Sequence, residues 1–399
     1  MKCLPHAKLR EARGNVLHDS HAEVLATRAF NRWLVDECAE LARKGVGSRH
    51  EWLRWARTGR GARWAEKESE GDGERRSNDE ADMEHLQHKV CEEDHHCHQP
   101  PFELRPDVEL HMFCSDAPCG DASMELIMSA QEDATPWSTP RPTGSQDGEH
   151  DNEDAMLGRG HFSRLGIVRR KPARPDAPVT LSKSCSDKLA LKQCTSLLCG
   201  VASLLVRGEG CYLRTLVLPE GQVIAEAVER AFGTDGKGRM RDVTRDDVQR
   251  RWREMGAGFA FRPFDVTTTR RVFEYGKQLA AGVEAQRNTV PSNLSVLYTL
   301  GCGERSGRQE ILTNGVLQGR KQLDPKGASC ASRRRMWEGV VDVLRAAGVG
   351  TLAERVQKGT YAQMKGSEQL APRKRVKRDV LETSLKGWKA NLGDDDWML

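Results

Sequence analysis

The sequence lacks any apolar run long enough to span a membrane, because none of its hydrophobic stretches approaches about eighteen consecutive apolar residues. Its first residues also lack the charged and then apolar pattern of a secretory signal. These two absences predict an intracellular location, in the nucleus or the cytoplasm. Twelve cysteines are present, but a chain of 399 residues is far longer than a domain stapled by disulfides. Burial and metal ligation therefore remain as uses for these thiols.

Charge is distributed unevenly along the chain. Residues 66–94 contain four basic and twelve acidic residues, a net charge of −8; because the whole chain carries +4, the remainder carries about +12. A basic body is compatible with a phosphate-rich partner. Residues 58–100 and 131–157 contain few large apolar side chains, so we expect two disordered insertions within a single domain covering residues 1–399.

The spacing of apolar residues predicts helices alternating with strands, which is typical of an α/β domain. Helices are expected at residues 21–43, 49–57, 121–129, 185–198, 223–232, 243–255, 329–347, 352–364 and 378–390. Strands are expected at residues 108–113, 201–206, 213–218, 294–300 and 310–313. Trp52 and Trp55 would share one face of the second helix, where we interpret them as packing residues rather than as platforms for bases.

Two short motifs stand at predicted helix starts. His21-Ala22-Glu23 begins one helix, and Pro118-Cys119 follows a strand and begins another. A His-x-Glu element followed by Pro-Cys is the pattern of zinc-dependent deaminases. Zinc there needs three nitrogen or sulfur ligands and an open position for water, whose pKa it lowers. Glu23, two residues after His21, is placed to carry protons to N1 of adenine and to the departing ammonia.

The third ligand is less evident from the pattern. A compact Pro-Cys-x-x-Cys motif would put the second cysteine at position 122, which is Ala122. Cys185 is the best candidate, because its place at a predicted helix start would stabilise a thiolate. Cys114 competes for this role, although its position at the end of a strand favours burial. Cys3 is expected near the site without binding the metal.

Three segments occur in an order that resembles the adenosine deaminases acting on RNA: His21-Ala22-Glu23, Pro118-Cys119-Gly120-Asp121-Ala122 and Ser184-Cys185-Ser186-Asp187-Lys188. Residues 158–166, the pair Lys171-Pro172 and residues 189–193 are similar to the tRNA-acting branch of this family rather than to the branch that edits double-stranded RNA. The resemblance extends from Lys2 to about Trp388, outside the two insertions.

The resemblance implies a cytidine-deaminase-like fold, with three α-β-α layers around a mixed central sheet. In that fold a helix and a strand pair would precede Met1. It also implies hydrolysis of adenosine to inosine at position 37 of tRNA-Ala, with the anticodon loop as partner and neither DNA nor membrane involved. The alternatives are a deaminase of double-stranded RNA and a catalytically decayed RNA-binding protein of the same fold.

Roles for individual residues follow from the same resemblance. His21, Cys119 and Cys185 would bind zinc, Glu23 would move protons, Asp19 would hydrogen-bond His21, and Lys171 would lie near a zinc-bound thiolate. Members of the family bury an inositol hexakisphosphate, for which the matching residues are Arg28, Lys188, Ser203, Arg333, Tyr361, Lys365 and Trp388, with Arg375 dependent on register. Thr27, Leu191 and Ala371 depart from the family pattern.

Two further tracts remain open to more than one interpretation. The first contains His85, His88, Cys91, His95, His96, Cys97 and His98; it matches no zinc-finger spacing, and we interpret it as disordered. The second, Arg373 to Arg378, is either a localisation signal or RNA patch, or the solvated face of an anion-binding helix.

Overall fold

The structure is a computed structural model that describes residues 3–56, 99–130, 133, 135, 158, 160–171, 178–256, 258–274 and 292–399. Almost all of the two predicted insertions, together with the histidine- and cysteine-rich tract, lies outside these residues. Among the helices that the structure describes, none is long and apolar enough to cross a membrane.

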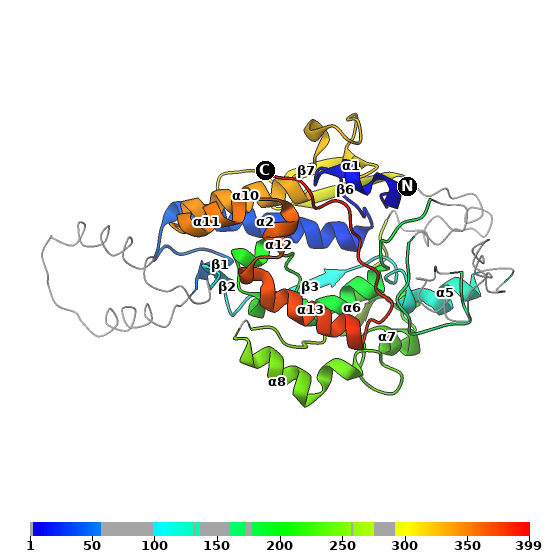
Figure 1. The fold of residues 1–399 in the computed structure, drawn as a ribbon. Helices are drawn as coiled ribbons and strands as arrows, with labels where there is room; N and C mark the ends of the chain where they lie inside the picture. The colour runs from blue at the N-terminus through cyan, green and yellow to red at the C-terminus, as the bar shows by residue number, and fades with distance from the viewer. Residues whose placement is uncertain are drawn as a thin grey trace, which may run out of the picture.

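Helices and strands alternate along the described chain (Figure 1). The helices of the first part of the chain are α1 (Leu9–Ala12), α2 (Ala22–Lys44), α5 (Met124–Ser129), α6 (Cys185–Thr195), α7 (Ala225–Phe232) and α8 (Asp246–Glu254). The later helices are α10 (Arg333–Ala346), α11 (Gly350–Gln357), α12 (Tyr361–Lys365) and α13 (Ala371–Thr383). The strands are β1 (Leu53–Trp55), β2 (Phe102–Leu104), β3 (Leu110–Phe113), β4 (Leu213–Pro219), β5 (Asp265–Thr269), β6 (Leu294–Thr299), β7 (Arg308–Thr313) and β8 (Val316–Leu317).

These strands form three sheets. β3, β4 and β5 are parallel in that order, with Met112 opposite Leu216 and Leu216 opposite Val266. β6, β7 and β8 are antiparallel, as are β1 and β2. The α/β class is confirmed, whereas each described sheet is purely parallel or purely antiparallel, so the predicted single mixed sheet is not confirmed.

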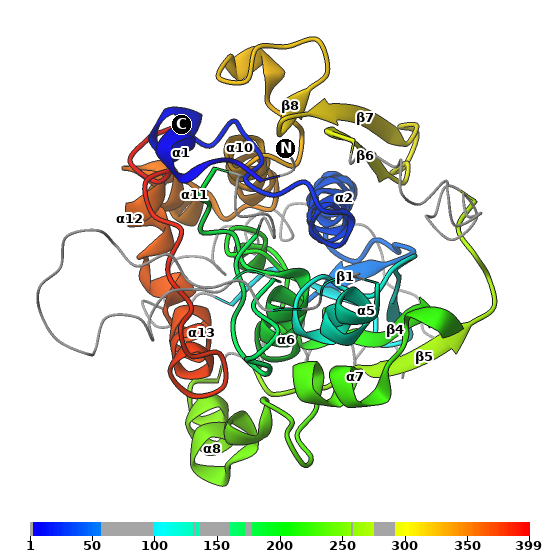
Figure 2. The same ribbon diagram turned by 90° about the vertical axis from the view of Figure 1, so that its right-hand side faces the viewer.

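Two large hydrophobic clusters hold the elements together. One joins α2, α10 and α11 to the paired strands β1 and β2 and includes Leu34, Leu41, Trp337 and Leu344. The other joins the parallel sheet to α6, α7, α8 and α13 and includes Leu189, Leu216, Trp252 and Val376. Figure 1 shows β3 between these two groups of helices, and Figure 2 shows α2 end-on beside β6 and β7.

Most predicted elements are found, but two are wrong in type. The predicted helix at residues 49–57 is instead strand β1, in which Trp55 pairs with Phe102 and their rings lie 4.8 Å apart. The packing role of the tryptophans is nevertheless confirmed, since the ring centroids of Trp52 and Trp33 lie 5.8 Å apart. The predicted strand at residues 201–206 is a buried turn around a short 3-10 helix, Ala202–Leu204. An apolar run that is buried on every side does not distinguish these states.

The predicted helices near the carboxyl end are shifted or divided. The one expected at residues 352–364 is split into α11 and α12 by Gly359, whose φ of +89° is unfavourable for other residues. Thr360 then caps α12 through a reciprocal capping box with Gln363. The helix expected at residues 378–390 is α13, which starts seven residues earlier and ends at Thr383.

Candidate metal centre

The first part of the site is the turn that leads into α2. His21 is the residue immediately before the helix, and Asp19 Oδ1 accepts a hydrogen bond of 3.0 Å from its backbone N–H. The predicted contact between Asp19 and His21 is therefore present through the backbone. Glu23 lies in the first turn of α2 and is half-buried.

The second part joins the loop after β3 to the start of α6. Cys119 lies in that loop, and Cys185 is the first residue of α6. Ser186 holds the two segments together, because its backbone N–H donates to Cys119 O at 3.0 Å and its hydroxyl donates to Pro118 O at 2.9 Å. Gly120, with φ of +106°, permits this approach, since a Cβ there would lie 2.2 Å from Ser184 Oγ.

These turns bring one imidazole and two thiols together. The ligand atoms of His21, Cys119 and Cys185 all lie within 4.8 Å of one another, with 3.8 Å between His21 Nδ1 and Cys119 Sγ. The backbone N–H of Cys185 also points at Cys119 Sγ, at 3.4 Å. One histidine and two cysteines are a donor set that zinc binds, leaving a fourth position for water. The three residues that the sequence nominated as ligands thus meet at one point.

The protonation states of these three side chains depend on one another. The hydrogen bond from the Cys185 thiol, aided by Lys171 and His21, holds the pKa of Cys119 well below its usual range. Burial and the same shared proton raise the pKa of Cys185. Burial alone would lower the pKa of His21, but hydrogen bonds with Cys119 and Cys3 raise it to about 10. The group therefore holds protons near neutral pH that a metal must displace.

Behind the ligands lies a buried chain of charges. Lys171 Nζ is 3.0 Å from Cys185 Sγ and 3.0 Å from Asp19 Oδ2, so it links a thiol to a carboxylate. Although burial opposes its charge, Cys119 and Asp19 raise the pKa of Lys171. Asp19 also accepts from the Ser182 hydroxyl at 2.8 Å and from Lys188. The predicted position of Lys171 beside a ligand thiol is present in the structure.

Two other cysteines, Cys114 and Cys3, are alternatives as ligands. Cys114 is buried at the end of β3, and burial together with the charge of Glu23 raises its pKa to about 12. It belongs to none of the potential metal-binding groups among the described residues. Cys3 is also buried; it forms a β-bridge with Asp19 and lies with Asp19 and His21 in a second close group. Cys3 therefore borders the site, as expected.

Sequence reasoning missed the ion pairs that fix the start of α6. Asp187, fully buried, accepts from Arg239 at 2.6 Å and from the backbone N–H of Arg169 at 2.8 Å. Asp121, also fully buried, accepts from Arg230 at 3.0 Å. Asp121 and Asp187 each lie two residues after a motif cysteine, but these hydrogen-bond partners are 18 to 109 residues away in the sequence. No local signal could have identified them.

The residues proposed to hold a polyanion lie on several elements that converge beside the chain of charges. Arg28 is on α2, Lys188 on α6, Arg333 at the start of α10, Tyr361 and Lys365 on α12, Ser203 in the short 3-10 helix Ala202–Leu204, and Trp388 after α13. Arg333 and Lys365 each lie 5.7 Å from the ring of Tyr361. Lys377 lies 6.0 Å from the ring of Trp388. Because the charge of Arg333 also acts on Arg28, Lys365 and Lys377, these residues form one basic cluster with Tyr361 and Trp388. Lys188 instead contacts Asp19 and Ser182, and Ser203 contacts Gly200.

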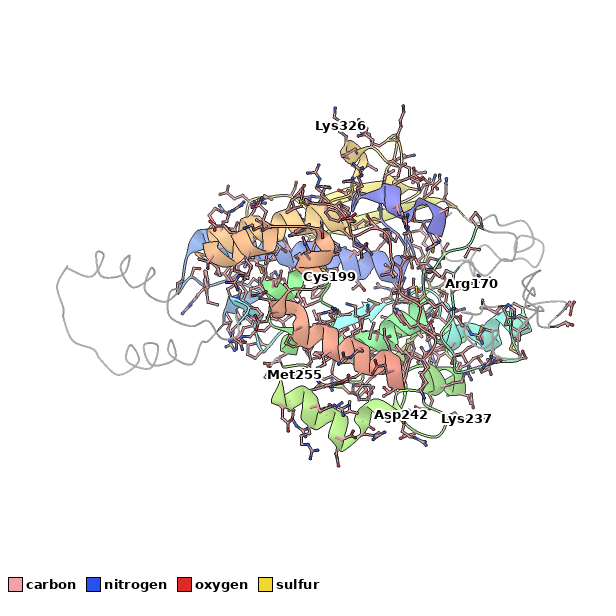
Figure 3. The ribbon with its side chains drawn as sticks, viewed as in Figure 1. Arg170, Cys199, Lys237, Asp242, Met255 and Lys326 are labelled. Atoms are coloured by element: carbon pink, nitrogen blue, oxygen red, sulfur yellow. The ribbon has the colours of Figure 1, made fainter. Side chains whose placement is uncertain are left out.

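The structure adds three cations to this basic cluster and moves a fourth out of it. Lys192 on α6 and Arg373 and Lys377 on α13 are half-buried, whereas Arg375 is exposed. Figure 3 labels Cys199, which is an electrostatic neighbour of Arg28, Lys192 and Arg373. The basic run at residues 373–378 therefore has one inward and one solvated face. The spacing of four residues between Arg373 and Lys377 is a helical signal that could have found them.

Electrostatics shows that the basic cluster is short of negative charge. Burial and neighbouring cations lower the pKa of Lys365 and of Lys377 to about 8. The same two causes lower the pKa of Lys192 well below its usual value. Arg373 Nε is buried and has no hydrogen-bond partner among the described residues. An anion with many oxygens would satisfy these groups.

Comparison with known proteins agrees with this geometry. The family model of the adenosine-deaminase (editase) domain matches residues 1–64 and 77–391. A Schizosaccharomyces pombe protein named tRNA-specific adenosine deaminase 1 is 29% identical over 396 residues, which are 99% of this chain and 82% of that protein. The Saccharomyces cerevisiae protein of the same name is 30% identical over 198 residues, 50% of this chain and 39% of that protein. This chain therefore belongs to the adenosine-deaminase (editase) domain family.

Proposed function

We propose that this chain is a zinc-dependent tRNA adenosine deaminase that converts adenosine to inosine. The observation that carries the proposal is the convergence of His21, Cys119 and Cys185, with Glu23 in the first turn of the helix that His21 precedes. In this proposal the domain covers residues 1–399, has the three-layer cytidine-deaminase arrangement, and works inside the cell, in the nucleus or the cytoplasm.

Each part of the chemistry has a residue to perform it. Zinc held by His21, Cys119 and Cys185 would supply a Lewis acid that brings the pKa of a water molecule towards 7. Glu23 takes one proton from the attacking water and delivers it to N1 of adenine. It then takes the remaining hydroxyl proton at C6 and passes it to the amine, which leaves as ammonia while the C6 carbonyl of inosine forms. Water is consumed, and inosine and ammonia are the products. Lys171 and Asp19 hold the ligands in place, because such outer partners fix ligand orientation.

The proposed substrate is adenosine 37 of tRNA-Ala, in the anticodon loop. Both relatives reported above are named as tRNA-specific adenosine deaminases, and one aligns with almost the whole of this chain. An unpaired loop nucleotide suits an enzyme that must reach C6, because a base outside a duplex needs little energy to be turned into a pocket.

We also propose inositol hexakisphosphate as a structural cofactor of the basic cluster. The support is the set of lysines with lowered pKa values and the unpartnered Arg373 Nε. Lys188 donates to Asp19, which in turn accepts from Lys171 beside the metal centre. Mass spectrometry of acid extracts of purified protein should recover about one inositol hexakisphosphate per chain. Protein with normal activity and no bound polyphosphate would contradict this cofactor.

The decisive experiment measures inosine formation in three RNAs: a tRNA-Ala transcript, the same transcript with guanosine at position 37, and a long RNA duplex. Wild-type protein should act on the first alone. Glu23→Ala should lower turnover by at least about hundredfold, the scale of general acid–base catalysis, while zinc content stays at one per chain. Glu226→Ala is a matched control, because Glu226 is exposed and also the second residue of its helix, α7. Inosine in the duplex, or in no RNA, would instead support one of the two alternatives.

A further inference from the structure

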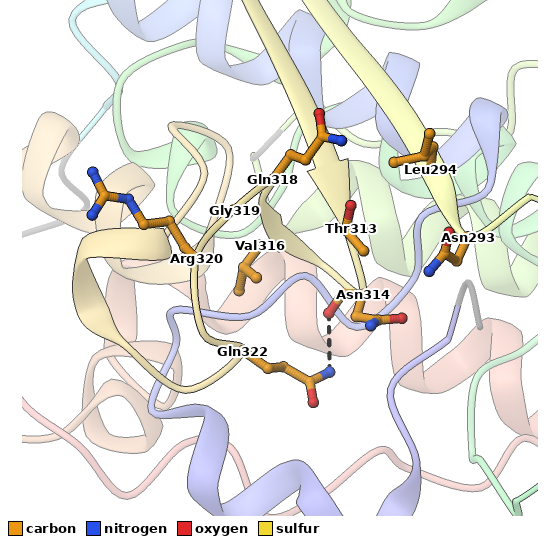
Figure 4. A pocket seen from close by; sticks show the side chains of 9 residues that line it. All are labelled: Asn293, Leu294, Thr313, Asn314, Val316, Gln318, Gly319, Arg320 and Gln322. Carbon is orange, nitrogen blue, oxygen red and sulfur yellow. Dashed lines mark hydrogen bonds between the residues drawn. The ribbon is translucent and has the colours of Figure 1, made fainter.

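A pocket of about 410 Å³ lies at the edge of the β6–β7–β8 sheet (Figure 4). It is formed where β6 begins, at the turn between β7 and β8, and in the loop after β8. Its lining residues are Asn293, Leu294, Thr313, Asn314, Val316, Gln318, Gly319, Arg320 and Gln322. Neither the metal centre nor the basic cluster uses any of them.

The lining combines three kinds of chemistry. Asn293, Asn314, Gln318 and Gln322 bring side-chain amides, which can donate and accept hydrogen bonds; that of Gln322 already donates to Asn314 O at 3.0 Å. Leu294 brings exposed aliphatic surface, whereas Val316 is buried. Arg320 is exposed and brings a guanidinium, for which no ion pair is found in the described part of the chain. A nucleotide requires groups of these three kinds: amides can bond the edge of its base, an apolar surface can contact the ring, and a cation can contact the phosphate.

The charge around the pocket points the same way. Lys321 and Lys326 are exposed in the loop that contributes Arg320 and Gln322, and Asp324 is the one acidic residue between positions 318 and 327. Lys8 Nζ also donates to Gln322 Oε1 at 3.4 Å. The loop of the pocket therefore carries three cations against one acid, and a fourth cation contacts a lining residue, which favours a polyanionic ligand.

The pocket wall is bonded directly to the segment that carries the metal centre. Gly315, in the β7–β8 turn, accepts a hydrogen bond of 2.8 Å from the backbone N–H of Leu17. Ser295 Oγ, next to Leu294, donates to the carbonyl of Ser20 at 3.1 Å. Because Ser20 precedes His21 and consecutive Cα atoms are about 3.8 Å apart, Leu294 and His21 lie within about 16 Å of each other. A strand of a few RNA nucleotides is long enough to span that distance.

We propose that this pocket binds a nucleotide of the RNA substrate near the target adenosine, on the same strand. Arg320 contacts its phosphate, and the side chain of Gln318 contacts its base. The pocket would thereby position the anticodon arm and select among RNAs. This inference rests on the proposed function, but its test is separable, since RNA contact can be measured without turnover.

Two exposed side chains provide the test variants, Arg320→Ala and Gln318→Ala. Arg355→Ala is the matched control, because Arg355 is also exposed and lies on α11, which packs against α10. With tRNA-Ala transcript, we expect each pocket variant to raise Kd and KM about five- to tenfold and to leave kcat within about twofold. Arg320→Ala should also reduce the slope of log Kd against log salt concentration by about one. Wild-type Kd, KM and salt slope in both variants would overturn the proposal.

A photo-crosslinking amino acid at position 318 gives the second measurement. Mass spectrometry should find the crosslink on a nucleotide of the anticodon arm. A protein that crosslinks there but forms no inosine would refute the deaminase assignment while supporting the pocket. A protein that forms inosine but crosslinks only elsewhere on the tRNA, or only to another protein chain, would refute the pocket and leave the deaminase assignment standing. Unchanged thermal unfolding of the variants excludes misfolding as the cause.

Discussion

Replacing Lys171 by methionine tests whether the buried chain of charges supports the metal centre. Methionine keeps the length of the side chain and removes its charge and donors. In the structure Lys171 Nζ serves two partners, Asp19 Oδ2 and Cys185 Sγ, each at 3.0 Å, and the side chains of Lys171 and Asp19 are almost fully buried. Asp19 would retain Ser182 and Lys188, whereas Cys185 would lose its neighbouring cation.

The size of the effect follows from these contacts. Removing one partner of a buried ion pair costs about 3–5 kcal/mol, and the two partners that Asp19 retains place Lys171→Met near the lower value, about 3 kcal/mol. For the metal, loss of an outer partner lowers affinity by roughly 10- to 100-fold. Both effects have the same sign, so the variant should be less stable and should bind zinc more weakly.

Urea unfolding and competition for zinc with a chelating dye measure these two quantities separately. Lys386→Met is the control, because it removes the same charge from an exposed position after α13. We expect the control to match the wild type in both assays. If Lys171→Met retains wild-type zinc affinity, the contact between Lys171 and Cys185 has no role in the metal centre. If only its stability falls, the lysine is a structural residue.

Two other predictions concern the thiols and the basic cluster. Cys185→Ser should lose zinc and Cys114→Ser should retain one zinc per chain, as metal analysis of the purified variants would show; the reverse result would exchange the two assignments. Lys377, with pKa lowered to about 8 by burial and neighbouring cations, binds fewer protons in the folded chain than an unfolded lysine does between pH 8 and 10.5. The free energy of unfolding of anion-free protein should therefore rise with pH across that window, by up to about 3 kcal/mol before solvent screening. Added inositol hexakisphosphate favours the charged lysine, so it should flatten this rise. Urea unfolding at pH 8, 9 and 10, with and without the anion, measures the effect. A free energy of unfolding that does not change with pH in either sample would show that the charges of these cations are already balanced within the protein.

The metal centre could be predicted from the sequence because its chemistry is concentrated in short motifs. His21 and Glu23 are two residues apart, and Cys119 and Cys185 each stand in a turn with recognisable flanking residues. The local pattern left the third ligand open between Cys185 and Cys114, and the family resemblance favoured Cys185. Strong helices such as α2 were found for a similar reason, since a periodic pattern of 23 residues outweighs local ambiguity.

Short apolar segments were predicted less well, because their state depends on distant partners. Residues 53–55 became strand β1 by pairing with Phe102–Leu104, about fifty positions away. Residues 201–206 lost their predicted strand because they are enclosed by α2, α10 and other elements of the first hydrophobic cluster. In both cases tertiary context decided between conformations of similar local preference.

The basic cluster shows how an error of register changes the chemistry of a helix. The sequence predicted a helix at residues 378–390, which left Arg373 to Arg378 at its margin, and the family resemblance offered Arg375 as an anion-binding residue that depended on register. In the structure α13 begins at Ala371, so Arg373 and Lys377 face inward and Arg375 faces solvent. Arg373 then donates to Leu198 O at 2.8 Å with one nitrogen and has no described partner for Nε. Composition alone indicated a basic helix, but only its packing against α6 determines which of its cations an anion could reach.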